Sequence, residues 1–356
     1  SGNFSLRQLI KILAIGIREG AGEIPKLLLF NFSGKEATFI TKKDDYYDLA
    51  TSTQHFGTCL VMDVKVSEGG LSAISSYIEV FNSADQFVRG YFIISIYDTD
   101  GTLIKEFRRA FTDQSNEAFL SNHMGAPLCW DGEDLLYTKE DDILGTIQKR
   151  EGPSFNTESL VLDITSIPNY TELENNWLNY RIPFYRLGFG HRIEKVGSHL
   201  YVSVPLISYK TLSIMSSPDN INFSGAVYDF LWNGSSYVIN ASSVINSTSD
   251  VLYGYDMCPP GPNGLMSVSK PIDHTVVRLN SSMAYVDQTI SSDLNFGLSI
   301  ENCHDAVYTI VNDSLYNINT GRSLSYPITN DEIISYIPPG NAILYKEEKI
   351  KTAIIA

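Results

Sequence analysis

The sequence predicts an all-β protein. Of its 356 residues, 43% are hydrophobic and only 19% are charged, so the chain is neither disordered nor a charge-rich helical assembly. It contains 21 Tyr and 17 Phe together with many Ser, Thr and Asn, and this mixture favours strands and turns over helices. From residue 57 onward, runs of β-branched and aromatic residues alternate with short polar turns.

The N-terminal segment is the most apolar stretch of the chain. Residues 6–17 are interrupted by the charged Arg7 and Lys11, and they are too few to cross a bilayer, so we expect no membrane span. No clean small-residue cleavage site follows, which argues against a signal peptide. We therefore expect a short helix or strand that docks on the body of the protein.

The clearest hairpin lies at residues 91–107. The strand-forming run Tyr91–Tyr97 is followed by the turn 98–101 (Asp-Thr-Asp-Gly) and by a second run, Thr102–Phe107. An Asp-Gly turn between two such runs is a strong hairpin signal. The two aspartates suggest calcium as an alternative, but the loop lacks the third ligand and the distal Glu of an EF-hand, so we expect a turn.

Similar hairpins recur in the second half of the chain. Segment 226–240 aligns with 306–319 with a single gap, 276–287 has the same form, and 134–137 and 199–204 begin comparable hairpins. Repeated antiparallel hairpins with an aromatic residue near each turn fit a β-propeller, in which every blade is a small sheet. A large antiparallel β-sandwich is the alternative. We favour the propeller.

The repeat suggests two regions. Residues 1–115 lack it and are predicted to form a small N-terminal β-rich docking region, and residues 116–356 are predicted to form the repeat-bearing β domain. The polar segment 112–122 is the candidate boundary. Helix is expected only at residues 6–17 and 171–178.

The net charge of the chain limits the kinds of molecule that it can be expected to bind. The 26 basic and 41 acidic side chains give a net charge of −15, which repels a phosphate backbone and makes nucleic acid an unexpected partner. From residue 211 to 345 there are only three basic residues against twelve acidic ones.

The cysteines do not indicate a metal centre. No Cys-x-x-Cys pair and no neighbouring histidine series is present, so we expect neither a metal nor another cofactor. Zero, one or two disulfides all remain open. The four cysteines are Cys59, Cys129, Cys258 and Cys303.

One segment resembles a named motif. Ser217-Pro-Asp219-Asn-Ile-Asn-Phe223 is similar to the Asp box, Ser-x-Asp-x-Gly-x-x-Trp, of sialidase-type β-propellers, with Asn220 at the glycine position and Phe223 as the aromatic residue. The resemblance implies a propeller hairpin in which Asp219 caps the turn and Phe223 packs between blades. It implies a structural role for the segment.

Catalytic motifs are not recognisable. A sialidase-like enzyme needs three converging arginines, and no spacing links the candidates, which are Arg181, Arg186, Arg192, Arg278 and Arg322. The sequence Cys303-His304-Asp305 suggests a nucleophile, but adjacent residues of a strand point to opposite faces. The Gly-x-Ser-x-Gly elbow is absent. We therefore expect a protein without catalysis.

Residues 177–192 are the best candidate for ligand binding. This segment concentrates aromatic residues and arginines in an otherwise acidic chain and is rich in Pro and Gly. Aromatic rings stack on sugars and guanidinium groups bind hydroxyls or carboxylates, which favours a glycan as ligand, although core packing with local charge pairing would explain the same residues. The predicted ligand-binding residues are Trp177, Tyr180, Arg181, Tyr185, Arg186, His191 and Arg192.

Nine Asn-x-Ser/Thr sequons begin at Asn3, Asn31, Asn169, Asn222, Asn233, Asn240, Asn246, Asn280 and Asn312. In a secreted or viral glycoprotein they would be surface glycosylation sites, and in a bacterial or phage protein they reflect only polar turns. The acidic, Ser- and Asn-rich surface is typical of a protein outside the cytoplasm.

These observations lead to three functional hypotheses. The first is an extracellular or virion-surface attachment protein, similar in layout to phage and viral attachment proteins, that binds a cell-surface glycan or protein receptor and docks on other virion or assembly subunits through residues 1–50. The second is a glycoside hydrolase or sialidase-like propeller enzyme, and the third is a structural virion decoration or tail scaffold protein.

Overall fold

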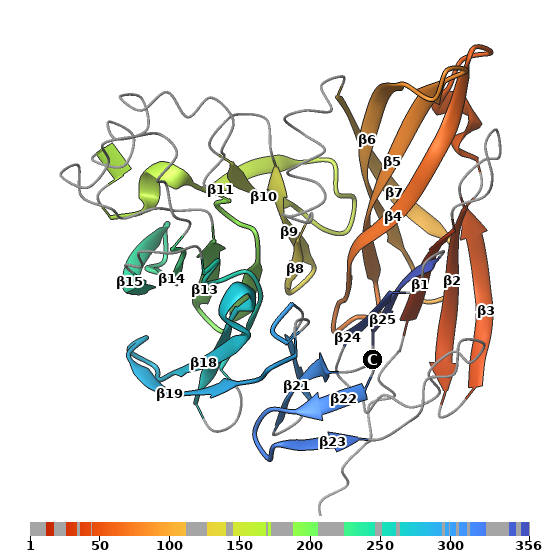
Figure 1. Cartoon of the computed structure of the whole chain (residues 1–356). Helices are drawn as coiled ribbons and strands as arrows, with labels where there is room; N and C mark the ends of the chain where they lie inside the picture. Colours follow the sequence, from red (N-terminus) through yellow and green to blue (C-terminus); the bar gives the residue numbers. More distant parts are fainter. Residues whose placement is uncertain are drawn as a thin grey trace, which may run out of the picture. The chain divides into compact units, whose positions relative to one another are not determined.

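The fold is known from a computed structural model of the chain (Figure 1). The structure describes residues 12–17, 26–33, 36–43, 45–111, 127–139, 145–168, 170–171, 188–205, 224–245, 251–260, 264–293, 296–298, 300–303, 306–311, 314–324, 342–346 and 350–355. Two compact units divide the chain: unit 1 combines Ser1–Thr112 with Thr329–Ala356, and unit 2 spans Asp113–Ile328.

The described residues of unit 2 form four antiparallel sheets of four strands, and each sheet is a simple meander of consecutive strands (Figure 1). The first sheet contains β8 (Leu128–Asp131), β9 (Asp134–Lys139), β10 (Thr146–Arg150) and β11 (Glu158–Asp163), and the second contains β12 (Ile193–Val196), β13 (His199–Val204), β14 (Ala226–Trp232) and β15 (Tyr237–Val244). The third contains β16 (Met257–Cys258), β17 (Met266–Lys270), β18 (Thr275–Leu279) and β19 (Tyr285–Ile290), and the fourth contains β20 (Ile300–Cys303), β21 (Ala306–Val311), β22 (Ser314–Asn317) and β23 (Arg322–Leu324).

This arrangement is that of propeller blades. The first strands of neighbouring sheets lie against each other, β8 against β12 and β16 against β20. Every hairpin stays inside its own small sheet, whereas a sandwich would distribute the strands over two large ones. The predicted all-β, propeller-type fold is confirmed.

The hairpins that resemble one another in sequence occupy different places in their blades. Segment 226–240 forms β14 and β15, the third and fourth strands of one blade, whereas 306–319 forms β21 and β22, the second and third strands of another. The alignment of these two segments therefore pairs non-equivalent strands. In a meander every strand is followed by a tight turn and an antiparallel strand, so neighbouring hairpins have the same sequence pattern.

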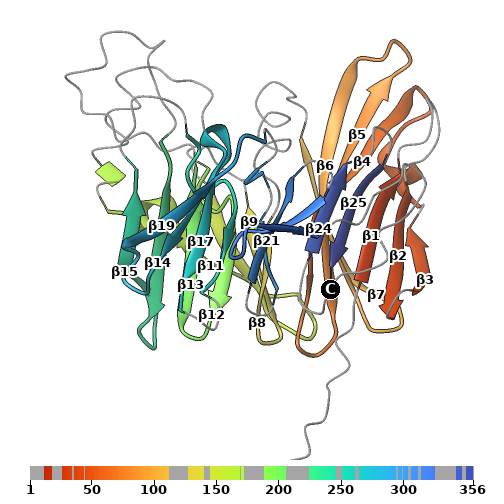
Figure 2. The same cartoon turned by 60° about the horizontal axis from the view of Figure 1, so that its bottom comes forward.

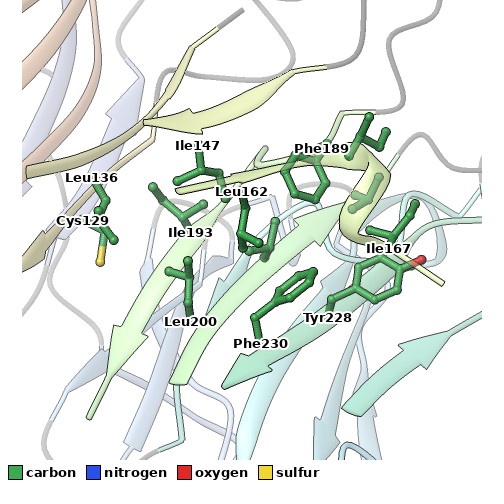
Figure 3. Packing of buried hydrophobic residues seen from close by; sticks show 14 residues of the cluster. Cys129, Leu136, Ile147, Leu162, Ile167, Phe189, Ile193, Leu200, Tyr228 and Phe230 are labelled. Carbon is green, nitrogen blue, oxygen red and sulfur yellow. The ribbon is translucent and has the colours of Figure 1, made fainter. Parts of the chain in front are cut away.

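The core lies between successive blades. Alternate residues of β13 point to opposite faces, so Leu200 packs toward the first blade while Tyr201 packs toward the third. Figure 3 shows side chains of the first two blades meeting face to face, with Ile147 and Leu162 from one sheet and Phe230 from the next. The second blade packs against a neighbour on each face, and its central strands are accordingly buried on both sides, over 200–204 in β13 and 226–230 in β14.

Unit 1 contains two further sheets. Figure 2 shows one of them, in which the strands from the two ends of the chain pair in the order β24-β25-β1-β2-β3. Its strands are β24 (Ala342–Lys346), β25 (Ile350–Ile355), β1 (Ile12–Ile17), β2 (Lys26–Ser33) and β3 (Glu36–Lys43). The other contains β4 (Gln54–Val66), β5 (Ser72–Asn82), β6 (Phe87–Tyr97) and β7 (Leu103–Phe111).

The hairpin predicted at residues 91–107 is formed by β6 and β7. Asp98 Oδ1 accepts hydrogen bonds from the backbone N–H groups of Asp100 (3.0 Å) and Thr102 (2.8 Å), and Gly101 has the left-handed φ of 79° that closes the turn. The Asp98 carboxylate therefore caps the turn.

The apolar N-terminal segment includes a strand, because β1 spans its second half, and its first half lies outside the described residues. The predicted helix at residues 171–178 also lies outside them, except for Thr171. Among the helices in the described ranges, none has the length and apolar character needed to cross a bilayer. Cys129 and Cys258 are buried and have reduced thiol side chains.

Candidate functional site

The segments that lead into the first strands of three blades share one sequence pattern. Each contains a buried aromatic residue, a glycine, two variable residues and an apolar residue that begins the strand. The segments are 189–193 (Phe-Gly-His-Arg-Ile), 253–257 (Tyr-Gly-Tyr-Asp-Met) and 296–300 (Phe-Gly-Leu-Ser-Ile). We call them the lead-in segments.

Each glycine of a lead-in segment has a left-handed backbone: φ is 76° at Gly190, 88° at Gly254 and 82° at Gly297. A Cβ atom on Gly254 would lie 2.9 Å from the carbonyl oxygen of Ala226 and 3.2 Å from Cβ of Ser203, both in the preceding blade. Glycine is thus required here both for the dihedral angle and for the close approach of two blades.

Small hydroxyl residues hold the lead-in segments in place. Ser203 Oγ accepts a hydrogen bond from Arg192 N (2.9 Å), and Ser269 Oγ accepts the equivalent bond from Asp256 N (2.8 Å). The backbone carbonyl oxygen of Ser203 also accepts a hydrogen bond from Gly190 N, and that of Ser269 accepts one from Gly254 N. Arg192 and Asp256 therefore occupy equivalent positions in consecutive blades.

The two variable positions bring an arginine and an aspartate together. Arg192 Nε donates to Asp256 Oδ1 (2.9 Å), and the same oxygen accepts from Met257 N (3.0 Å). Asp256 Oδ2 accepts from Ile300 N (2.9 Å), the first residue of β20. The Asp256 side chain is 6% exposed and that of Arg192 26% exposed. One buried carboxylate thus joins the starts of three first strands, while Arg192 still reaches solvent.

Two rings lie beside this ion pair. His191 and Tyr255 have ring centroids 5.0 Å apart at an interplanar angle of 44°. His191 is buried and Tyr255 partly buried. Burial raises the pKa of the Tyr255 hydroxyl, and Asp256 raises it further, against the opposing effect of Arg192. Tyr255 is therefore a neutral hydroxyl at physiological pH. Together His191, Arg192, Tyr255 and Asp256 form what we call the lead-in site.

The structure describes two of the seven predicted ligand-binding residues, His191 and Arg192, and brings them together with Tyr255 and Asp256. The other five, Trp177, Tyr180, Arg181, Tyr185 and Arg186, lie outside the described residues. So does the Asp-box-like segment with Ser217, Asp219 and Phe223.

A second buried carboxylate lies on the blade of β13 and β14. Asp229 is fully buried and accepts hydrogen bonds from His199 Nδ1 (2.9 and 3.1 Å to its two oxygens) and from Asn240 Nδ2 (2.7 Å). His199 stacks on Tyr201 with ring centroids 6.0 Å apart. Burial, reinforced by Asp229, raises the pKa of Tyr201 to about 12.

The lead-in site offers few groups for catalysis. Asp256 accepts three hydrogen bonds, so both of its carboxylate oxygens are already engaged by groups of the protein. Arg278 belongs to the outer hairpin of its blade, formed by β18 and β19, and is paired there with Asp287 (2.5 Å). Within the described ranges no three His, Cys, Asp or Glu residues cluster in a way that could hold a metal ion.

Sequence reasoning missed Tyr255, Asp256 and the lead-in pattern. The aromatic-Gly-x-x-apolar signal is readable in the sequence at Phe189, Tyr253 and Phe296, and it also occurs at Phe56, inside β4 of unit 1. The hairpin strands have a stronger sequence pattern than the short lead-in segments do. In unit 2 the signal marks the start of three of the four described blades, and there it gives the register that the hairpin alignment lacks.

Comparison with known proteins yields a fold-level likeness alone. No family model and no curated protein matches the chain. Among solved structures, it is similar to virginiamycin B lyase from Staphylococcus aureus (TM-score 0.42, 10% identity, 83% of this chain and 94% of that one covered). It is also similar to a putative 6-phosphogluconolactonase from Bacteroides uniformis (0.46, 8%, 89% and 81%) and to the periplasmic gluconolactonase PpgL of Pseudomonas aeruginosa (0.37, 10%, 88% and 94%). At these values no activity is transferred to this chain.

Proposed function

We propose that the chain is a propeller-based attachment protein, located on a virion or cell exterior, that binds a glycan or a protein receptor at the lead-in site without catalysing a reaction. The observation that carries the proposal is the contact of His191 and Arg192 with Tyr255 and Asp256. The last two residues of segment 177–192 and the start of the next blade thereby meet at one place.

The chemistry of the lead-in site supports a saccharide ligand. A guanidinium group held in a fixed orientation by Asp256 offers directed donors to hydroxyl or carboxylate oxygens. The neighbouring ring of Tyr255 supplies an apolar face with a polar tip. The aromatic and basic residues predicted at 177–186 would extend this surface.

The absence of catalysis is supported by the role of Asp256. Glycoside hydrolysis needs two carboxyl groups that flank the scissile bond, and a carboxylate fully engaged by backbone N–H groups and an arginine is unsuited to either role. Among the described residues, Asp256 is the one carboxylate in the lead-in segments.

A glycan array tests the proposal. We expect the wild type to bind a restricted set of saccharides, and we expect the Tyr185→Ala/Arg186→Ala double variant and the Tyr255→Ala variant to lose at least tenfold in affinity. The matched control is Arg278→Ala, which removes an arginine of a similar ion pair from the outer hairpin and should leave binding unchanged.

The other two hypotheses predict different outcomes. Release of reducing sugar from a polysaccharide panel would indicate a glycoside hydrolase. Binding to neither glycans nor cell surfaces, or equal binding by the wild type and both site variants, would contradict the proposal and favour a scaffold protein.

Truncation of residues 1–50 tests the docking role: incorporation into an assembly should be lost, while the remaining chain still folds and binds.

A further inference from the structure

The turn between β14 and β15 directs three hydrogen-bond donors at the side-chain oxygen of Asn233. Asn233 Oδ1 accepts from Ser235 N, Ser235 Oγ and Ser236 N, each at 3.0 Å. Residues 233–236 are all exposed, so the turn is open to water. Three donors on one carbonyl oxygen draw electron density away from its carbon atom, Cγ, and make that carbon more electrophilic.

The residue that follows Asn233 supplies an unhindered nucleophile. Gly234 has a φ of 100°, and apart from its two chain neighbours no atom lies within 4 Å of the position that a Cβ would occupy. Within the part of the chain that the structure describes, the backbone N–H group of Gly234 donates no hydrogen bond. Its nitrogen atom is therefore available to attack Cγ of the preceding side chain.

We propose that Asn233 is a site of spontaneous modification, at which the side chain cyclises onto Gly234 N and loses its amide group. A bond forms between Gly234 N and Asn233 Cγ, the bond between Cγ and Nδ2 breaks, and the Gly234 amide proton leaves with Nδ2 as ammonia. Water then opens the cyclic imide at either carbonyl group and gives aspartate or isoaspartate. The three donors stabilise the negative charge that develops on Oδ1 during the attack, and water is the one co-reactant.

The next blade contains a matched turn that lacks the glycine. Between β18 and β19, Asn280 Oδ1 accepts from Ser282 N (3.0 Å), Ser282 Oγ (2.8 Å) and Ala284 N (3.0 Å), so it has the same number and kinds of donor. The residue that follows Asn280 is Ser281, whose side chain hinders the approach of its own backbone nitrogen to Cγ. The two turns therefore separate the effect of the glycine from that of the donors.

The modification would alter the end of the blade that lies away from the lead-in site. In a four-stranded meander the turn after the third strand lies at the end where the first strand finishes, whereas the lead-in segment lies where the first strand begins. Aspartate keeps the oxygen atoms that accept the three hydrogen bonds and adds a negative charge, and isoaspartate adds a methylene group to the backbone of the turn. The proposal therefore does not rest on the attachment function.

Peptide mapping by mass spectrometry tests the proposal on the folded, full-length protein. A bacterial expression host avoids a glycan on the Asn233 sequon. After prolonged incubation in mildly alkaline buffer, in which the attacking nitrogen loses its proton more readily, we expect Asn233 to convert at least about tenfold faster than Asn280. The map also separates Asn233 from a second Asn-Gly pair, 263–264, whose asparagine lies outside the described residues.

Three substitutions test the part that the turn plays. Ser235→Ala removes one donor and keeps the Asn-Gly pair, so it should slow the conversion about three- to tenfold, the contribution of one exposed hydrogen bond. The matched control is Ser236→Ala, because Ser236 bonds to Asn233 through its backbone N–H group, and it should leave the rate unchanged. Ser281→Gly should raise the rate at Asn280 to that of Asn233.

Three results would overturn the proposal. The first is an Asn233 that stays intact in the folded protein, and conversion of the urea-unfolded chain alone would show that the turn protects the side chain. The second is an equal rate in the wild type and in Ser235→Ala, which would mean that the donors do not act on the carbonyl group. The third is an Asn280 that converts no faster in Ser281→Gly than in the wild type.

Discussion

Asp229 and Asp256 are both buried carboxylates of unit 2, but their surroundings differ. The partners of Asp229, His199 and Asn240, are side chains of its own sheet, and both are partly open to solvent. Asp256 instead accepts from Arg192 of the preceding blade and from the backbone N–H group of Ile300 in the following one. One carboxylate stabilises a blade, and the other stabilises the seam between blades.

The two carboxylates differ in whether water can replace them as hydrogen-bond acceptors after they are removed. His199 is 36% exposed, so water can form hydrogen bonds with its ring nitrogen atoms when Asp229 is removed. The backbone N–H group of Ile300 is buried and donates to Asp256 Oδ2. An unpaired buried donor costs the full desolvation free energy, so Asp256 should matter more for stability.

Asp256→Ala should have the largest effect. It removes three accepted hydrogen bonds and leaves Arg192 without its buried counter-ion, which we expect to lower the free energy of unfolding by about 3–5 kcal/mol. Urea denaturation measures the loss. Asp287→Ala, at the partly exposed pair with Arg278, is the control and should cost at most about 1 kcal/mol. Equal losses in the two variants would contradict the seam role of Asp256.

Gly254→Ala tests the same seam through the backbone. An alanine would adopt a left-handed φ of 88° and would press its Cβ against the Ala226 carbonyl oxygen, so we expect a loss of about 2–4 kcal/mol. Gly234 is the matched control, because its φ is 100° but no atom lies within 4 Å of the added Cβ. Gly234→Ala should cost only the backbone strain, about 1–2 kcal/mol. A smaller loss at Gly254 than at Gly234 in urea denaturation would argue against tight contact of the blades.

The strands of the blades could be predicted from the sequence, but the contacts between neighbouring blades could not. A run of β-branched and aromatic residues bounded by polar turns is a local signal, so a segment such as Ala226–Trp232 shows its structure without knowledge of the rest of the chain. Arg192 and Asp256 lie far apart in sequence, and nothing local distinguishes Asp256 from the other 40 acidic residues. Which carboxylate is buried depends on how blades pack.

The candidate site was predicted in part for the same reason. His191 and Arg192 stood out because aromatic and basic residues are concentrated before them in the sequence. Tyr255 has no such surroundings and becomes recognisable only when the lead-in segments are compared. Its equivalence to His191 follows from the glycines at 190 and 254, which have the same left-handed backbone.

Asp229→Ala should cost less than Asp256→Ala. His199 and Asn240 lose a shared acceptor, but both reach water, so we expect a decrease of about 1–3 kcal/mol in the free energy of unfolding. Differential scanning calorimetry at pH 7 would show a correspondingly smaller drop in melting temperature than for Asp256→Ala. A larger drop at Asp229 would reverse the ranking of the two carboxylates.

The smallest effect is expected from Tyr201, through the pH dependence of stability. Its pKa is raised from 10 to about 12 in the folded protein, mainly by burial and further by Asp229. Because the unfolded state ionises first, the folded state is favoured fully below pH 10 and loses this stabilisation as the pH rises from 10 to 12. The contribution is about 1–2 kcal/mol when solvent screening is allowed for. Tyr201→Phe should therefore flatten the decline in urea midpoint over this pH range, and Asp229→Asn should flatten it partially. If the urea midpoint of Tyr201→Phe declined with pH as steeply as that of the wild type, burial and Asp229 would have no effect on the ionisation of this hydroxyl.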